Sequence, residues 1–351
     1  MSVAIDYVRL QGEYCARMGS PFYGVLLARA ADDMVAGGPL AAVFADYPHE
    51  PVASAMALRL MGCVHGLVLS GAAPTLAPFY PSVGGDGDGE RAWPVFRRFV
   101  AAHLATLRAG LERGVQTNEV GRTAALIVGF LAVARECGLP LRCLEVGASG
   151  GLNLRWDRFR YEAPDGAWGD RGSPVVLREC YPEGGVPFDV AAHVVERAGC
   201  DPHPIDPTTP EGERALLSFV WPDQVVRLAL LRAAIGMARC VPATVERANG
   251  ADWLAARLAH GVPGVATIVY HSIVIQYFDP SSRDRFLATL TQAGARATAA
   301  SPLAWVRMEP GGEQAEVRVT TWPGGVERLV ATTGFHGRDV RPVLAPQPRV
   351  P

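Results

Sequence analysis

The chain has 351 residues, of which 49% are hydrophobic and 19% charged, and its formal net charge is −2. This composition is typical of a globular protein with a large core and a second lobe, and it excludes a disordered chain. All 33 basic residues are arginines, without a long basic run. The densest cluster, Arg155, Arg158 and Arg160, indicates a solvated face or a structural ion pair, so we expect no nucleic-acid partner.

The seven cysteines are scattered and form no C-x-x-C pair. We therefore expect neither a disulfide framework nor a zinc or other metal site, and we expect a reducing, cytoplasmic compartment. The first residues include Asp6, Arg9 and Glu13, which is atypical of a signal peptide. Apolar stretches are interrupted, as by Arg59 and His65, or too short, as at 262–278. We expect no membrane span and no membrane partner.

Residues 1–138 predict a lobe made mostly of helices. The expected helices cover 7–18, 22–36, 51–70, 93–111 and 120–137. A glycine-aspartate loop at 84–89 separates the third from the fourth. His65 lies inside the apolar third helix, and we interpret it mainly as a core residue. Asn118 suits the N-cap of the last helix and Glu119 its first turn.

Residues 139–154 predict a strand, a glycine turn and a helix. The apolar strand at 141–146 carries Glu145 near its end, the small residues of 147–151 follow, and Asn153 begins the next helix. This order is typical of a nucleotide crevice at the carboxyl end of a parallel sheet. The dinucleotide pattern G-x-G-x-x-G fails, because Ser149 and Leu152 stand at its second and third glycine positions. An ordinary tight turn without a ligand is the alternative.

The turn reads E-x-G-x-S-x-G, which resembles the first motif of class I S-adenosylmethionine (SAM) dependent methyltransferases. The resemblance implies an α/β fold with a Rossmann-like, seven-stranded methyltransferase sheet over 139–351, and SAM as cofactor. In that superfamily the acidic residue lies near the methionine end and the small residues make room for the cofactor. The cofactor-binding residues expected here are Glu145, Gly147, Ser149, Gly151 and Asn153.

Beyond the turn, Pro164-Asp165-Gly166 predicts a hairpin insertion near 158–180. The second strand of the sheet is expected within 188–200. The acidic residue that follows this strand suits a ribose, because a carboxylate accepts from both hydroxyls. Asp201 fits best, with Asp206 and Glu196 as alternatives. A proline-rich loop with helix-capping aspartates is the other interpretation.

Two regions follow. Residues 210–239 predict a long helical region, interrupted at 221–223, where Pro222 suits a first helical position. Within 245–258, Asp252 and Trp253 resemble the acidic and apolar pair that methyltransferases place against the adenine. An aspartate at a helix start is also routine for purely structural reasons.

Val265 to Tyr270 is β-branched and apolar, as in a central parallel strand. His271 and Ser272 fall where this strand ends, and the resemblance places them in the fourth-strand position that faces the transferred methyl. Ser272 is expected to contact the cofactor. His271 is our candidate general base, with pocket lining or a structural role as alternatives. A helix at 281–293, a strand at 303–308 and a hairpin of 317–321 with 328–332 complete the expected domain.

The polar cluster of Thr117, Asn118, Glu119 and Arg122 is expected to face the crevice, although a helix cap with a solvated Glu–Arg pair is the alternative. The expected substrate-binding residues are Asn118, Glu119, Arg122, Tyr161 and Trp221. The helical lobe should cover the crevice and shape this acceptor site.

The expected function is SAM-dependent methyl transfer to a small-molecule acceptor. Alternatives are a SAM- or nucleoside-binding protein without catalysis, and a non-methylating transferase or oxidoreductase on the same fold. The missing dinucleotide glycines argue against NAD. The sequence does not decide the oligomeric state, and a homodimer is the assembly that we consider.

Several phrases are further similar to one uncharacterised family of bacterial proteins, a domain of unknown function assigned to this fold. This similarity spans nearly the whole chain and supplies no substrate. The phrases are S-P-F-Y at 20–23, A-P-F-Y-P-S at 77–82, Q-T-N-E-V-G-R at 116–122, 145–153 with Trp156-Asp157, and W-P-D-Q at 221–224.

Overall fold

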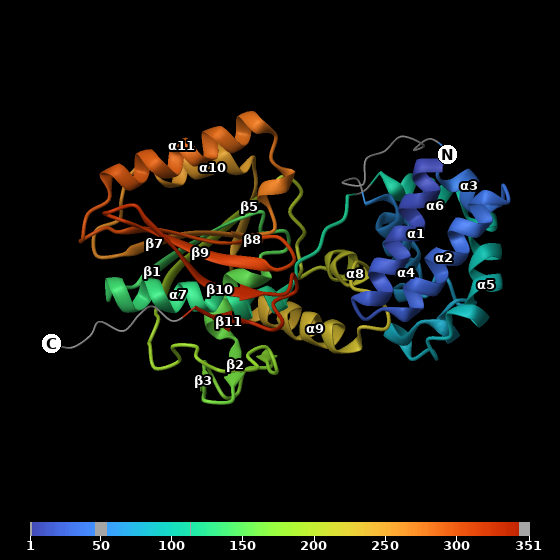
Figure 1. Ribbon diagram of the computed structural model, residues 1–351, viewed down its shortest axis with the longest axis horizontal. Helices are drawn as coiled ribbons and strands as arrows, with labels where there is room; N and C mark the ends of the chain where they lie inside the picture. The colour runs from blue at the N-terminus through green and yellow to red at the C-terminus, as the bar shows by residue number, and fades with distance from the viewer. Residues whose placement is uncertain (1, 46–54, 113, 344–351) are drawn as a thin grey trace. The chain divides into compact units, whose positions relative to one another are not determined.

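The computed structural model describes residues 2–45, 55–112 and 114–343, drawn in colour in Figure 1. The chain forms two compact units, residues 1–117 with 209–232 and residues 118–208 with 233–351. The boundary that we expected at 138/139 falls at 117/118, and 209–232 return to the helical unit. The reason is α7 (Thr123–Cys137), which is buried along nearly its whole length because it packs on the sheet.

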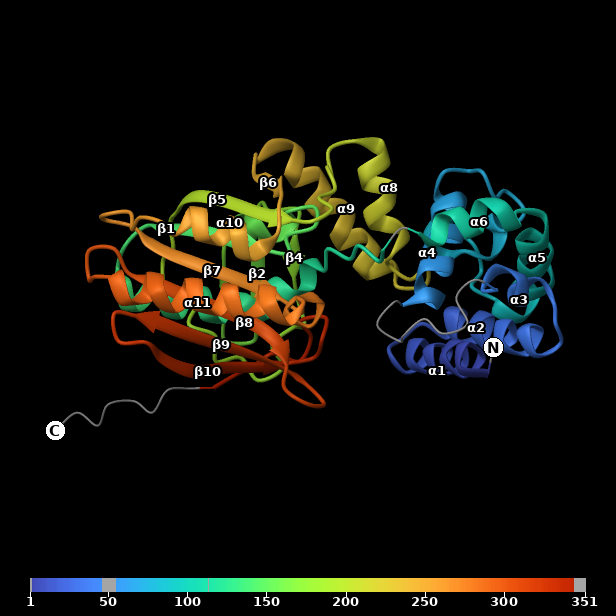
Figure 2. The ribbon, with the colours of Figure 1, turned by 90° about the horizontal axis from the view of Figure 1, so that it is seen from above.

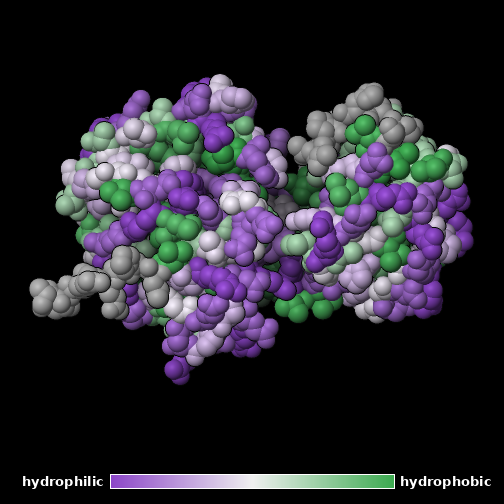
Figure 3. Space-filling view, viewed as in Figure 1, coloured by the Kyte–Doolittle hydropathy of each residue, from purple (hydrophilic) through white to green (hydrophobic). Residues whose placement is uncertain are grey.

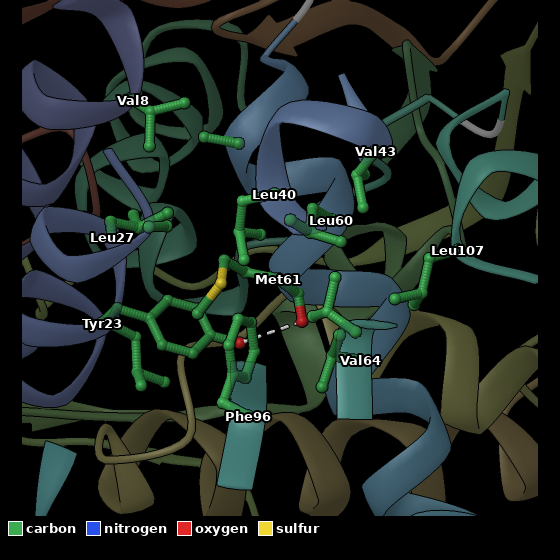
Figure 4. Packing of buried hydrophobic residues seen from close by; sticks show 14 of the residues in the cluster. Val8, Tyr23, Leu27, Leu40, Val43, Leu60, Met61, Val64, Phe96 and Leu107 are labelled. Atoms are coloured by element: carbon green, nitrogen blue, oxygen red, sulfur yellow. Dashed lines mark hydrogen bonds between the residues drawn. The ribbon is translucent and has the colours of Figure 1, made fainter. Parts of the chain in front are cut away.

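The first unit is helical, and its helices enclose one apolar core. Figure 4 shows this core, in which the Tyr23 hydroxyl donates to the Met61 carbonyl at 3.3 Å. The expected helix at 93–111 is two helices that meet at His103, where φ is −119°. Residues 51–54 of the expected helix at 51–70 lie outside the described residues. The helices of this unit are α1 (Ser2–Arg17), α2 (Pro21–Val35), α3 (Pro39–Val43), α4 (Met56–Leu69), α5 (Gly89–Ala102), α6 (Leu104–Leu111) and α8 (Pro210–Ser218).

The start of α2 is bound to a segment about 200 residues later. The Ser20 hydroxyl donates to the Asp223 carboxylate at 2.6 Å, and the Phe22 amide donates to its other oxygen at 3.0 Å. Pro222 therefore does not open a helix, because α9 (Val225–Cys240) begins after this clasp. Two of the phrases noted in the sequence, 20–23 and 221–224, meet here.

The second unit is built on an eight-stranded sheet of order β11-β10-β9-β8-β7-β1-β5-β6. The strands from β6 to β8 in this order are parallel, and β9, β10 and β11 are antiparallel. The expected α/β fold with a large, mostly parallel sheet is present, but the sheet has eight strands, including the two-residue β11, where we expected seven. Their bounds are β1 (Leu141–Val146), β5 (Val194–Asp201), β6 (Thr244–Arg247), β7 (Ala266–Ser272), β8 (Leu303–Pro310), β9 (Ala315–Trp322), β10 (Val326–Thr333) and β11 (Arg341–Pro342).

Helices cover both faces of this sheet, as Figures 1 and 2 show. One face carries α10 (Gly250–Arg257) and α11 (Pro280–Arg296), and the other carries α7. β1 and β7 are buried along their whole length because helices lie on both sides of them. The carboxyl ends of the parallel strands are therefore the part of the sheet where a ligand is expected.

The connection from β1 to β5 differs from our expectation. A 3-10 segment, η5 (Leu152–Arg158), follows the glycine turn in place of an α-helix, and it is kinked at Arg155. The expected insertion is a small three-stranded sheet of β2 (Arg160–Ala163), β3 (Gly166–Trp168) and β4 (Val176–Leu177).

On the face drawn in Figure 3, hydrophilic and hydrophobic residues are interspersed over each unit. Helices in the described part of the chain all fall short of the length and apolar character needed to cross a bilayer.

Candidate functional site

The candidate site begins where β1 and β7 lie side by side. After β1 the chain returns to the sheet as β5 on one side, and later as β7 on the other, so the order reverses between β1 and β7. Such a switch point is where α/β sheets bind ligands. Glu145 and Tyr270 are partners in register there, and the Tyr270 hydroxyl donates to the Glu145 carboxylate at 3.3 Å.

The Glu145 carboxyl is buried, with 3% of the residue exposed. Burial is the main cause that raises its pKa to about 8. Among the described residues, no arginine or histidine nitrogen lies within ion-pair distance of this carboxyl. No ion pair therefore neutralises this buried acid, and the more distant guanidinium groups of Arg155 and Arg122 only partly oppose the rise in its pKa.

The turn after β1 needs its glycines for backbone reasons. Gly147 and Gly151 have φ of 73° and 66°, and Ser149 has a positive φ of 52°. A Cβ on Gly147 would lie 2.6 Å from a Val274 methyl, and one on Gly151 would lie 2.5 Å from a Val245 methyl. The missing side chains thus make room for neighbouring valines. A bulky residue at Gly147 would disturb the fold before it blocked any ligand.

Asp201 fixes this turn. At the end of β5 its carboxylate accepts from the Ser149 amide at 2.9 Å and from the His203 amide at 2.8 Å. The amides of Gly147 and Ala148 donate to the Cys200 carbonyl. The structure therefore brings Asp201 to the glycine turn. Each carboxylate oxygen keeps a further lone pair for a ligand hydroxyl.

The segment 118–122 also lies against the turn. The Asn118 side chain accepts from the Leu152 amide at 3.0 Å, and the Asn153 side chain donates to the Glu119 carbonyl at 3.3 Å. Arg122 donates to the Ser272 carbonyl at the end of β7, at 3.1 Å. Asn118 is therefore no cap of α7, as we expected from its position, but a link to the turn. Thr117 is part of the helical unit.

Asn153 leaves one polar atom unsatisfied. Its Oδ1 is buried and has no hydrogen-bond partner among the described residues. Buried acceptors are nearly always paired, so an unpaired one beside the turn is a candidate ligand contact.

His271 is placed differently from our expectation of a base. It is fully buried, its Nδ1 lies 2.7 Å from Glu309 Oε1, and its Nε2 accepts from the Trp305 indole at 3.0 Å. Because the indole can only donate, Nε2 must be the acceptor, and Nδ1 carries the hydrogen toward Glu309. His271 faces the α11 side of the sheet, against Phe286, and not the switch point. Both ring nitrogens of His271 therefore make hydrogen bonds that stabilise the fold.

The two residues expected around an adenine also lie elsewhere. The Asp252 side chain is 69% exposed and lies 3.8 Å from the Arg285 guanidinium. Trp253 is buried in the core cluster under α10, where its indole donates to Glu246 at 3.0 Å. Asp252 follows the common pattern of an acidic residue in the first turn of a helix.

Two residues that we expected to contact the substrate are buried in the protein interior instead. The Tyr161 hydroxyl donates to the Trp156 carbonyl at 2.9 Å, and the residue is fully buried in β2. Trp221 packs into the core cluster of the helical unit. Of the alternatives for a ribose contact, Glu196 lies within β5 and pairs with Arg142 at 3.0 Å.

The sequence reasoning missed two residues near the switch point. Tyr270 enters the sequence analysis only as the end of the apolar run that begins at Val265, although strand alternation points it to the face opposite His271. His336 follows β10, and its Nδ1 lies 3.2 Å from Glu119 Oε2. Nothing local in the sequence marks His336, because its partner is 217 residues away. The described residues contain no group of three His, Cys, Asp or Glu side chains arranged for a metal ion.

A pocket of about 520 Å³ borders the turn at Gly150. Asp206, the remaining ribose alternative, lines it and accepts from the amide and hydroxyl of Thr208. The volume of this pocket is within the range of small-molecule sites.

A family model described as "Uncharacterized protein conserved in bacteria (DUF2332)" matches residues 6–341. No curated protein and no solved structure matches the chain.

Proposed function

Since the chain belongs to this bacterial family, whose name specifies no activity, we propose a function from the geometry of the turn. The proposal is that SAM binds at the switch point between β1 and β7 and that its methyl group passes to a small-molecule acceptor.

The observation that carries the proposal is the Glu145 carboxyl. A buried acid with no cation at ion-pair distance is costly to ionise, and a cationic ligand group beside it would reduce that cost. SAM carries both an ammonium and a sulfonium. Glu145 also stands at the position where the E-x-G-x-S-x-G motif places the acid near the methionine end.

Three further residues support a nucleoside beside Glu145. Asp201 is the ribose candidate, because it lies at the end of the neighbouring strand and its oxygens keep lone pairs. Asn153 offers its unpaired Oδ1. Asn118 holds the turn that both residues flank.

Methyl transfer in such a site would depend on positioning. Holding acceptor and sulfonium in line supplies most of what this reaction needs, and the cofactor carries the chemistry. His271 is not assigned as a base, because both of its nitrogens are bonded within the fold. That observation favours the second candidate, a SAM- or nucleoside-binding protein without catalysis. Conversion of SAM to S-adenosylhomocysteine in the presence of acceptor panels separates the two candidates.

Calorimetric titration with SAM, S-adenosylhomocysteine and NAD tests the binding step. We expect saturable binding of the first two and none of NAD. Glu145→Gln should weaken SAM binding about tenfold or more, as the loss of a buried charge-assisted contact predicts. Asp252→Asn is the matched control and should leave the affinity unchanged, because Asp252 is exposed. Wild-type protein that binds NAD and not SAM would overturn the proposal.

A further inference from the structure

The pocket beside Gly150 lies within the α/β unit, and four segments line it. They are the glycine turn, η5, the loop 204–208 after β5, and residues 238–245 at the end of α9 and the start of β6. The lining includes apolar side chains from different segments, such as Ile205 and Val245. The pocket thus has room for a small organic molecule with an apolar body.

Arg155 is the buried charge of this pocket. Only 3% of the residue is exposed. Its Nε donates to the Val241 carbonyl and its Nη1 to the Gly151 carbonyl, both at 2.7 Å. These bonds fix the guanidinium at the pocket wall. Its Nη2 makes no hydrogen bond to any residue that the structure describes.

Arg155 differs from two other shielded arginines of this unit, the half-buried Arg197 and the buried Arg142. Arg197 pairs with Asp157 at 2.6 Å, and Arg142 pairs with Glu196 at 3.0 Å. No carboxylate of the described residues lies within 4.0 Å of Arg155. Burial, followed by the nearby charge of Arg197, lowers the pKa of Arg155. The carboxylate of Glu145, beyond ion-pair distance, partly opposes this shift. A buried cation without a carboxylate at ion-pair distance is unfavourable, and a ligand anion would supply the missing negative charge.

The rest of the lining agrees with an anionic ligand. Arg239 adds a second positive charge. Asp206 is the acid of the lining, and the amide and hydroxyl of Thr208 already donate to its carboxylate. Guanidinium groups bind carboxylates and phosphates through two parallel hydrogen bonds.

We propose that this pocket binds a small organic anion, a carboxylate or a phosphate, whose charged group is held by Arg155. The inference goes beyond the proposed function, since it holds whether or not SAM binds at the switch point.

The proposal is tested by titrating the whole chain with inorganic phosphate and with benzoate. Sodium chloride keeps the ionic strength constant. Binding is followed by thermal shift and calorimetry. We expect at least one probe to bind saturably and to raise the melting temperature. Phosphate binding alone points to a phosphorylated ligand, and benzoate binding alone to a carboxylate with an apolar body. If neither probe binds, the proposal is wrong.

Two variants locate the site. Ala243→Phe places a ring in the pocket without changing Arg155, and Arg155→Met removes the charge. Each variant should bind the probe that the wild type binds at least about tenfold more weakly. Arg171→Gln, at an exposed turn, is the charge-matched control and should bind as the wild type does. Should Arg155→Met fail to fold, Ala243→Phe decides. Wild-type affinity in the Ala243→Phe variant would overturn the assignment of the pocket.

Discussion

A glutamine in place of Glu145 would keep its size and polarity and lose only the ability to ionise, which makes this residue a sensitive probe of the switch point. Burial raises the carboxyl pKa to about 8, above its ordinary value of 4.5. Between these two pH values the unfolded chain has lost the proton and the folded chain keeps it. The ligand-free protein should therefore lose stability as pH rises from about 4.5 to about 8.

We predict that Glu145→Gln removes this pH dependence. A glutamine resembles the protonated acid and can still accept from Tyr270. The variant should match the wild type near pH 4 and exceed its free energy of unfolding at pH 9, by on the order of 5 kcal/mol. Denaturant unfolding at several pH values measures it. Parallel curves for the two proteins would show that Glu145 ionises normally in the folded state.

A second prediction at this scale concerns His271. His271→Phe leaves the Trp305 indole and the Glu309 carboxylate without their shared partner. The free energy of unfolding should fall by about 2–4 kcal/mol, because buried polar groups lose their hydrogen bonds. His260→Phe, at an exposed position, is the control and should change it by less than about 0.5 kcal/mol. SAM binding by the folded His271→Phe protein should be unchanged. A specific loss of SAM binding would mean that His271 contributes to the ligand site.

At the scale of elements, the start of α2 depends on a distant carboxylate. Asp223 accepts from the Ser20 hydroxyl and the Phe22 amide. Asp223→Ala should destabilise the helical unit by about 1–2 kcal/mol, as the loss of a helix cap does. Asp32→Ala removes only an exposed ion pair with Arg9, so its effect should stay below about 1 kcal/mol.

A double-mutant cycle with Ser20→Ala separates the clasp from other effects of these changes. The two losses should not add, because both substitutions break the same hydrogen bond. Strict additivity, measured by thermal unfolding, would mean that the two side chains do not cooperate in the folded unit.

At the scale of the whole molecule, the sequence predicts what local patterns encode. The runs that form β1 and β7 are apolar and the closing hairpin is marked by Pro323-Gly324, so these elements are confirmed. The unit to which α7 belongs is not predictable from the sequence. Its residues resemble those of the preceding apolar helices, although α7 packs on the sheet.

The candidate site shows the same division. The glycine turn was located from its spacing, and the link from Asn118 to Leu152 shows that the preceding polar cluster lies against it. The place of His271 was not predictable, because its partners Trp305 and Glu309 follow 34 and 38 residues later. A side chain at a strand end can face either the crevice or the core. Which of the two it faces depends on residues that are distant in the sequence.

A crystal structure of the protein with S-adenosylhomocysteine tests the central claim most directly. We predict that the ligand lies over residues 145–151, with its amino group near the Glu145 carboxylate and its ribose hydroxyls within hydrogen-bond distance of Asp201. The measured quantity is the distance from the ligand nitrogen to Glu145 Oε, expected at about 2.7–3.2 Å. A ligand bound at a different place in the molecule, with the turn unoccupied, would contradict the claim.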